Sequence, residues 1–475
     1  MATDANASRI AGMVFCSLVE ADESGGYRPA LARSWTRVDA RTYEFELEDG
    51  AFFHDGTPVT AGDVASTYRS VLDGAIASPK RAALSVLASV EAQGTSIVRF
   101  RLAQTTGAVL EAAGLGILPA ALAGRTNLNA KELVGCGPYR ITGSQADGSV
   151  ELAAFERWYE QAPKIRAITF RVVPDAIMRV LELRYGSLDF VQNALEPDAV
   201  AYLAEHESTL RVIVSPYDAV QYLSFQHRHP ALADVRVRRA IAHAIDRAAI
   251  VEHVLRGQAR VASGLLPPHH WAYRAVSSYE HDPDLARALL EAAGHHDPDG
   301  DGPAPRLRLR YRTSTVELRR RIAEVLAAQL GEVGIELDVV SHEWGTFFGD
   351  IRRGDFDLHS LAWIGIRDPD LFRLAFHSKM TPPNGSNRGA FSDARVDRLA
   401  ERGQRATGTE RRRRIYARLQ RRTASLLPYV MLWWPSNVVV ASTRLEGFTP
   451  HPTGDLTGLA RARLGDASSG AARSR

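Results

Sequence analysis

The stretch from residue 31 to residue 72 constrains the fold more than any other part of the chain, because it sets a strand, two tight turns and a capped helix in one fixed order. Two Asp-Gly dipeptides mark the turns. Thr60, followed three residues later by Asp63, is a capping-box pattern, so a helix should begin there. The strand is predicted by apolar residues that alternate with polar ones, Tyr43, Phe45 and Leu47. The helix is predicted by apolar residues on one face, Val64, Tyr68, Val71 and Leu72.

The whole chain has the length and composition of a multi-lobed globular protein. Its 475 residues are enough for two or three lobes. Helical and strand patterns alternate throughout, which predicts an α/β class. The net charge is only +3, so we expect no nucleic-acid partner. The run Arg411–Arg414 precedes apolar residues at helical spacing, and we interpret it as the solvated face of an amphipathic helix. No hydrophobic stretch is suited to crossing a membrane.

Several further segments follow one another in an order that is typical of one family. Besides the stretch 31–72, these include Gly135-Cys-Gly-Pro-Tyr139, the segment LADVRVRRAIAHAIDR at 232–247 and Arg353-Gly-Asp-Phe-Asp357. Together they resemble the extracytoplasmic solute-binding proteins of ABC importers, family 5, the peptide- and nickel-binding class. The resemblance extends along almost the whole chain.

The resemblance implies a two-lobed α/β architecture, the periplasmic-binding-protein type II fold, with an extra β-rich subdomain in the first lobe. We expect the first lobe to comprise residues 1–38, 135–220 and 430–475, the inserted subdomain residues 39–134, and the second lobe residues 221–429. A single apolar strand, Tyr429 to Val440, should return the chain to the first lobe. The lobes would then be joined near Tyr222 and near Tyr429, and two such crossings form a plausible hinge.

The sequence lacks the usual signs of covalent or metal chemistry. We found no nucleophile elbow, P-loop, HExxH, paired CxxC or dinucleotide fingerprint, so we expect neither an enzyme nor a cofactor. The acidic segment Asp297–Gly302 resembles the start of a calcium loop, but Arg308 stands where a Glu is required. The pairs His269-His270 and His295-His296 are interpreted as surface histidines, and no metal is expected. Two cysteines, Cys16 and Cys136, could form one bridge or stay free, and free thiols are favoured.

The segment 361–370, LAWIGIRDPD, is the most informative for ligand chemistry. In the peptide binders that it resembles, a similar strand end carries an Asp that pairs with the ligand ammonium. Here that position holds Ile366, or Arg367 if the gap is placed one residue later. The standard ammonium contact is therefore lost. Arg367 can instead meet a ligand anion, or it can pair with Asp368 or Asp370 at the rim of the pocket.

Other candidate ligand contacts are aromatic or polar residues near predicted strand ends and loops. Aromatic side chains suit a cleft between lobes because they offer broad apolar faces. Core packing is the alternative role for each of them, and it is strongest for Trp344, which we place on a helical stripe. The full set of candidates comprises Trp363, Arg367, Ile366, Tyr222, Phe225, Trp344, Arg312, Asn387, Arg388 and Trp433.

We therefore expect the solute-binding component of an ABC importer that captures a short peptide or a similar polar compound between its lobes. Its partners would be that ligand and a membrane permease complex, and the protein would be monomeric. The sequence opens on a polar helix that should end near Val19, and we expect an export signal to have preceded it, with a periplasmic location. A ligand-sensing module of a regulator and, less favoured, a cleft hydrolase are the alternatives.

Overall fold

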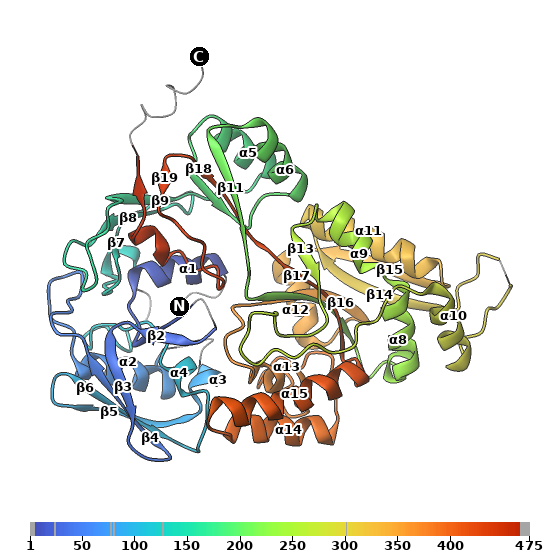
Figure 1. The fold of residues 1–475 in the computed structure, drawn as a ribbon, viewed down its shortest axis with the longest axis horizontal. Coiled ribbons are helices and arrows are strands. Elements are labelled where there is room, and N and C mark those ends of the chain that lie inside the picture. The colour runs from blue at the N-terminus through green and yellow to red at the C-terminus, as the bar shows by residue number, and fades with distance from the viewer. Residues whose placement is uncertain are drawn as a thin grey trace.

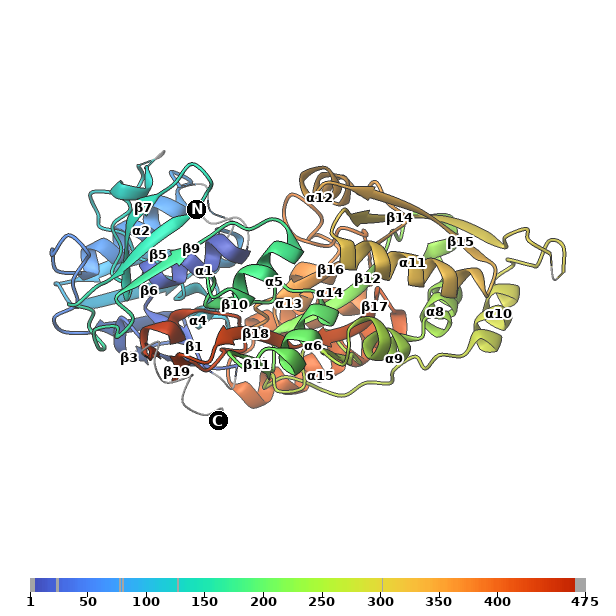
Figure 2. The ribbon, with the colours of Figure 1, turned by 90° about the horizontal axis from the view of Figure 1, so that it is seen from above.

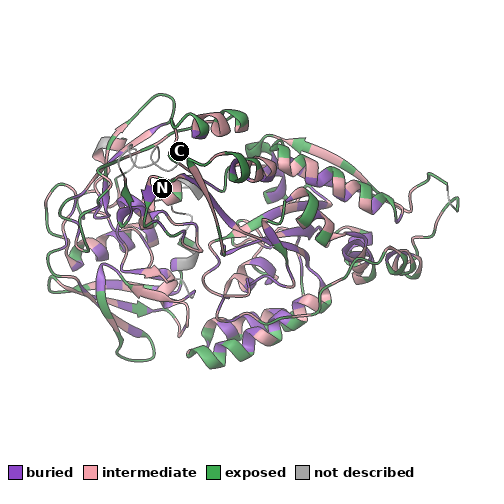
Figure 3. Cartoon of the chain, turned by 45° about the horizontal axis from the view of Figure 1, so that its top comes forward, coloured by how far each residue is buried: buried purple, intermediate pink, exposed green. Residues whose placement is uncertain are grey.

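The computed structural model describes residues 5–22, 25–76, 78, 81–125, 128–300 and 302–465. The chain forms two lobes that lie side by side (Figure 1). Seen from above, the molecule is elongated along the line that joins the lobes (Figure 2). Buried residues run through the interior of each lobe, and exposed residues cover the outer helices (Figure 3). The predicted two-lobed α/β fold is thus confirmed.

A four-stranded antiparallel sheet forms the β-rich part of the first lobe, at the lower left of Figure 1. Its strands, in the order β3-β4-β6-β5, are Ala32–Arg37, Thr42–Leu47, Ile97–Leu102 and Leu87–Gln93. Helix α2 (Ala61–Leu72) packs on this sheet through Val64, Tyr68 and Val71, which are fully buried. The capping box is present, because the Oδ2 atom of Asp63 accepts hydrogen bonds from the backbone N–H (2.9 Å) and the hydroxyl (2.6 Å) of Thr60. The strand and helix predicted from residues 31–72 are therefore correct.

The rest of the first lobe is built from short strands and helices that surround helix α1 (Ala5–Val14). Helix α1 ends at Val14, earlier than the predicted Val19, which instead begins a strand. This lobe also holds two two-stranded and two three-stranded sheets. The two-stranded sheets are β1 (Val19–Ala21) with β2 (Tyr27–Pro29), and β19 (Leu445–Glu446) with β20 (Arg463–Leu464). The three-stranded sheets are β7 (Tyr139–Ser144), β8 (Val150–Ala154) and β9 (Ala167–Phe170), and β10 (Phe190–Gln192), β18 (Asn437–Ser442) and β11 (Leu210–Ser215). Helices α5 (Ala176–Arg184) and α6 (Pro197–His206) lie beside the last of these sheets (Figure 1).

The second lobe is organised around one mixed sheet of six strands. In sheet order these are β13 (Ala259–Val261), β17 (Tyr429–Pro435), β12 (Ala219–Phe225), β16 (Leu358–Ile364), β14 (Leu307–Ser314) and β15 (Ile335–His342). Strand β14 runs parallel to both β15 and β16, and the other pairs are antiparallel.

Helices cover both faces of this sheet, because alternate residues of a strand point to opposite faces. Leu223 and Phe225 pack in a cluster with helices α8 (Val235–Ala244), α10 (Pro283–Ala292) and α11 (Glu317–Gly331). Val220 and Tyr222 pack in another cluster with α12 (Trp344–Arg353), α13 (Leu371–Phe376), α14 (Ala394–Arg405) and α15 (Thr409–Leu426). The second lobe thus has two apolar layers separated by the sheet.

The chain passes between the lobes at two places that differ from the predicted ones. Residues 216–218 join β11 of the first lobe to β12 of the second, and Ser436 separates β17 from β18 (Figure 1). The single strand predicted from Tyr429 to Val440 is wrong, since its two halves pair in different sheets. Pro435-Ser436-Asn437 interrupts the apolar run at this point, and these residues are the sequence sign of the break. We accordingly propose lobe boundaries at 216–218 and at 436.

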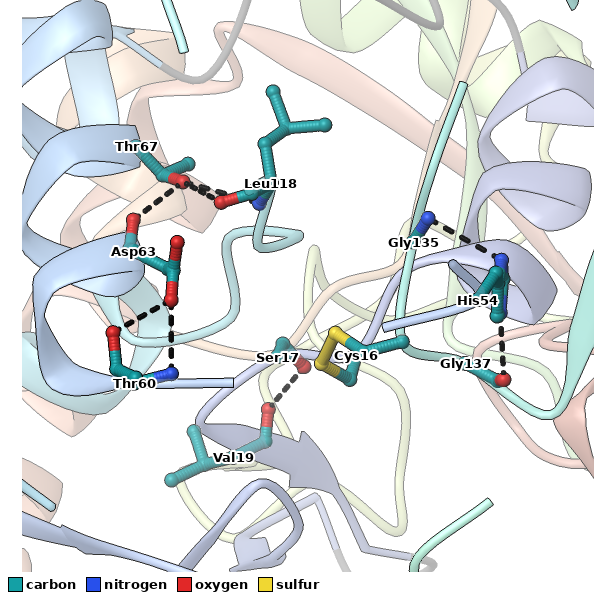
Figure 4. The surroundings of a disulfide bond; sticks show 11 residues. Cys16, Ser17, Val19, His54, Thr60, Asp63, Thr67, Leu118, Gly135 and Gly137 are labelled. Atoms are coloured by element: carbon teal, nitrogen blue, oxygen red, sulfur yellow. Dashed lines mark hydrogen bonds between the residues drawn. A yellow bond between two sulfur atoms is a disulfide. The ribbon is translucent and has the colours of Figure 1, made fainter. Parts of the chain in front are cut away.

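A disulfide joins Cys16 to Cys136, so the expectation of two free thiols is wrong. The bond ties the segment after α1 to the loop before β7 (Figure 4). Sequence could not show this, because the two residues are 120 positions apart and only the fold brings their Cα atoms to 5.1 Å. The bond fixes the chain at the junction between the β-rich part and the remainder of the first lobe.

His54 holds the same loop from the other side. Its Nε2 atom lies 3.0 Å from the carbonyl oxygen of Gly137, and its Nδ1 atom accepts from the N–H of Gly135 at 3.3 Å (Figure 4). This arrangement requires a neutral ring with the proton on Nε2. Burial lowers the pKa of His54 from 6.5 to about 4.

We predict that His54 makes folding stability depend on pH. Below pH 6.5 the unfolded state takes up a proton that the folded state resists, so the stability should fall as the pH drops from about 6.5 towards 4. The full loss would be about 3 kcal/mol. Denaturant unfolding of the wild type and of His54→Gln at several pH values checks this. The difference between the two unfolding free energies removes the contribution of the other histidines. Parallel pH profiles for the two proteins would contradict the assignment.

Within the described residues, no helix is long and apolar enough to cross a membrane, and no cluster of three metal-ligating side chains occurs. One residue of the acidic segment 297–302, Asp301, lies outside the described part of the chain.

Candidate ligand-binding site

A large cavity lies between the two lobes, with a volume of about 1060 Å³. Most of its wall belongs to the first lobe: α1, β1, the segment around Glu111 to Gly116, and the segment from Gly447 to Arg461. The second lobe contributes Ile364, Gly365 and Arg367, which follow β16. Because residues of both lobes meet around one cavity, a solute held there would contact both.

Hydrogen bonds hold the backbone of the loop after β16, and they fix the backbone position of Arg367. The N–H of Ile366 donates to the carbonyl oxygen of Asp218 at 3.0 Å. The Nε2 atom of His270 lies 3.0 Å from the carbonyl oxygen of Arg367, while its Nδ1 atom accepts from Ala272 N–H, so Nε2 is the donor. His270 is therefore a buried support for this loop rather than the surface histidine that was predicted. The adjacent His269 likewise contacts Asp218, at 2.5 Å.

Arg367 does not pair with either of the two acids that follow it. Asp368 binds Arg412 through two contacts of 2.6 and 2.9 Å, and Asp370 binds Arg373 at 2.8 Å. Among the described residues, the guanidinium of Arg367 has neither a side-chain hydrogen bond nor an ion pair. It lies against the first lobe, with Nη1 3.9 Å from the point where a β-carbon on Gly114 would stand. The alternative in which Arg367 pairs with its neighbours is wrong.

Two acidic side chains of the first lobe share the cavity wall with Arg367. Glu111 accepts a 2.5 Å hydrogen bond from the hydroxyl of Tyr27, and Asp455 accepts one of 2.6 Å from the N–H of Thr457. Burial raises the pKa of Tyr27 well above its usual value and Glu111 adds to this effect, so Tyr27 remains a neutral donor. Burial alone would lower the pKa of Arg367, but negative charge from Glu111 and other neighbours outweighs it, and that pKa is raised. Arg367 is thus charged.

The remaining charged residues of the wall largely neutralise one another. Arg28 binds both Glu20 and Glu160, and Arg461 binds Glu160 at 2.5 Å. Burial raises the pKa of Glu20, and Arg28 opposes that rise. This network braces the wall. Arg367, Glu111 and Asp455 lie outside it and make no ion pair with a described residue.

Three of the predicted contacts form a cluster beside the cavity rather than in its wall. Tyr222 is buried and stacks on Tyr429, with ring centroids 4.2 Å apart, and on Trp363 at 6.2 Å. The guanidinium of Arg388 lies over the rings of Trp363 (5.6 Å) and Phe348 (5.3 Å). This packing lies at the end of β16, just before the loop that carries Arg367, and a direct ligand role for these residues stays a prediction.

The other predicted contacts have structural partners of their own. Phe225 and Trp433 are buried in the apolar layer under α8 and α11, and Ile366 is buried in the opposite layer. Asn387 is buried and binds backbone atoms of His377 and Phe391. These placements argue for packing rather than ligand contact, because sequence spacing marks aromatic residues without showing which face of the sheet they occupy.

Arg312 and Trp344 also differ from what was expected. Arg312 binds Asp355 at 3.2 Å and His342 at 3.0 Å, so its charge is already compensated. Trp344 begins α12 and is 45% exposed, which excludes the core position that its helical spacing suggested. Phe347 and Ile351 of the same stripe are buried. The stripe therefore starts one turn later than predicted.

The lobes also touch at a second place, where α14 and α15 reach the first lobe (Figure 1). The N–H of Gly107 donates to the carbonyl oxygen of Gln404 at 3.3 Å, and Arg412 donates to the carbonyl oxygen of Gly107, also at 3.3 Å. Arg412 is buried, although its run of arginines was interpreted as a solvated face. Arg412 also binds Asp368, the residue after Arg367. This ion pair therefore links the contact between the lobes to the wall of the cavity.

Most of the cavity wall was missed by the sequence reasoning. Glu111, Asp455 and the acidic and basic network lie in the first lobe, in segments separated by hundreds of residues. No local pattern marks them. Only the resemblance to the peptide binders, which pointed to Ile366 or Arg367, carried a usable signal.

The chain belongs to the bacterial extracellular solute-binding proteins, family 5, whose model matches residues 26–381. It is 27% identical to the oligopeptide-binding protein AppA of Bacillus subtilis (strain 168), over 96% of this chain and 87% of that protein. It is 28% identical to the probable di/tripeptide-binding protein 5 of Pseudomonas aeruginosa (strain UCBPP-PA14), over 95% and 90% of the two chains. The structure of AppA from Bacillus subtilis in complex with a nonapeptide matches with a TM-score of 0.87 at 26% identity, covering 98% of this chain and 95% of that one.

The membership confirms the class of protein that the sequence resembled. The chain is a solute-binding component of an ABC importer, in a family of extracytoplasmic proteins.

Proposed function

We propose that this protein captures a short peptide, or a similarly compact polar solute, in the cavity between its lobes and hands it unchanged to a membrane permease. The observation that carries the proposal is the cavity of about 1060 Å³ whose wall comes from both lobes. A solute there stabilises the closed arrangement only through contacts that differ between the open and closed forms. Two relatives, an oligopeptide-binding protein and a probable di/tripeptide-binding protein, favour peptides among polar solutes.

We also propose that the protein is a monomer and leaves its ligand chemically unchanged. Among the described residues that line the cavity, one hydroxyl is close to a histidine, that of Thr453, 2.8 Å from Nδ1 of His451. The same hydroxyl accepts from the N–H of Asp455 at 3.3 Å, so it is part of a local turn. This geometry favours a structural role, and the hydrolase alternative gains no support from it.

The disulfide supports an extracytoplasmic location on grounds that are independent of the family. Disulfides form and persist in oxidising compartments and are rare in the cytosol. Cys16 and Cys136 form such a bond here. We therefore propose export to the periplasm or an equivalent outer compartment.

Titration calorimetry with a tripeptide library, followed by mass spectrometry of the recovered library, tests this function. We expect saturable binding of one equivalent per chain and recovery of intact peptides. Cleaved peptides would contradict the absence of catalysis, and a lack of binding would contradict the ligand class.

A further inference from the structure

Arg367 stands out in the cavity because the backbone around it is held in place, while its guanidinium makes no ion pair with any described residue. Backbone contacts to Asp218 and His270 hold its loop, and the ion pair of Asp368 with Arg412 holds the next residue. A guanidinium has five N–H donors in a rigid fork that matches a carboxylate. In the described part of the chain, these donors meet no side-chain acceptor, although the side chain is half-buried.

The acids across the cavity do not take over that role. No ion pair within 4.0 Å joins Arg367 to Glu111 or to Asp455, although both contribute to its electrostatic environment. Glu111 is held by Tyr27 and Asp455 by Thr457, so each acid is anchored to its own lobe. A positive group of one lobe and two negative groups of the other therefore line one cavity.

We infer that the solute is a zwitterion that places its carboxylate on Arg367 and its cationic group towards Glu111 and Asp455. A compound with only negative charge would meet two uncompensated acids, and a compound with only positive charge would leave the arginine without an acceptor. For a peptide, this orientation directs the carboxyl end, rather than the amino end, at the loop after β16. The inference rests on the proposed function, because it specifies the ligand of the same cavity.

Three tripeptide libraries separate the two charged ends: free peptides, their C-terminal amides, and their N-acetylated forms. Each library is added to the wild type, to Arg367→Gln and to Arg308→Gln, and the thermal shift and the binding isotherm are recorded. Arg308 is a matched control, because it is an exposed arginine of the same lobe that pairs with Glu336 away from the cavity.

We expect the amides to bind the wild type about 10- to 100-fold more weakly than the free peptides, which is the usual contribution of a hydrogen bond to a charged group. Arg367→Gln should abolish this difference, and Arg308→Gln should preserve it. Acetylation should weaken binding to the wild type, and Glu111→Gln should reduce that second difference. If Arg367→Gln does not fold, Arg367→Lys retains the charge and should keep a reduced preference for the free carboxylate.

Equal affinity for free peptides and amides would overturn the role of Arg367 while leaving peptide capture intact. Failure of all three libraries to bind the wild type would overturn the proposed peptide function, and the inference would fall with it. A preference for the free carboxylate that persists in Arg367→Gln would place the carboxylate elsewhere in the cavity.

Discussion

Removing the disulfide should lower the stability of the first lobe by about 2–5 kcal/mol, the usual cost of losing a native disulfide. Cys16 and Cys136 close a loop of 120 residues, and a bond across so long a loop strongly restricts the unfolded chain. The loop contains the whole four-stranded sheet, so its unfolding should be affected most. The residues beside Cys16, Phe15 and Ser17, line the cavity, and ligand affinity should therefore fall as well.

Urea unfolding of the wild type and of Cys16→Ser/Cys136→Ser, each with and without dithiothreitol, measures this effect. The reductant should move the midpoint of the wild type towards that of the double variant. It should leave the double variant unchanged, which controls for effects of the reductant itself. Equal midpoints for the oxidised wild type and the variant would show that the bond does not stabilise the fold.

Replacing Gly107 by valine should weaken solute binding about 5- to 150-fold, because it blocks the contact between the lobes at α14 and α15. A β-carbon at Gly107 would lie 2.6 Å from Cδ of Arg412 and 2.7 Å from the carbonyl oxygen of Ala406. The carbonyl oxygen of Ala406 belongs to the backbone, so it can move only if the backbone shifts. Overpacking of this kind costs roughly 1–3 kcal/mol, and that cost falls on the arrangement in which the lobes touch.

The matched control for Gly107→Val is Gly331→Ala. A β-carbon at Gly331 meets no atom within 4 Å, so this change should leave both affinity and lobe arrangement as they are. Binding is measured by calorimetry, and unfolding midpoints show whether each lobe remains intact. Unchanged affinity in Gly107→Val, with both lobes folded, would mean that this contact does not take part in closure.

The sequence predicted the local elements and the overall class well, because these depend on periodicity and on caps. The strand around Phe45, the helix begun by Thr60 and the amphipathic helix that carries Arg411–Arg414 were all found. The break at Ser436 was not, because the apolar residues on its two sides were grouped into one strand across Pro435-Ser436-Asn437, although they pair in different sheets. Periodicity indicates that a residue is buried, but it does not indicate which element the residue packs against.

The site was harder to predict for the same reason. Arg367 was singled out through the resemblance to peptide binders, whose matching strand end carries an Asp that pairs with the ligand. The structure shows that its adjacent acids are bound to Arg412 and Arg373. Glu111 and Asp455 could not be found, because their relation to Arg367 exists only when three distant segments are folded together. A run of arginines likewise looked solvated, although Arg412 is buried against the first lobe.

The most direct test of the account is the distance between the lobes with and without solute. Spin labels can be attached at Asp49→Cys in the first lobe and Asp284→Cys in the second, since both side chains are highly exposed, at 85% and 96%. Double electron–electron resonance measures the distance between the two labels. It should show a longer or broader distance distribution in the free protein and a single shorter distance at saturation with the free tripeptide library. An identical distribution in the two states, with binding confirmed by calorimetry, would contradict capture by closure of the two lobes.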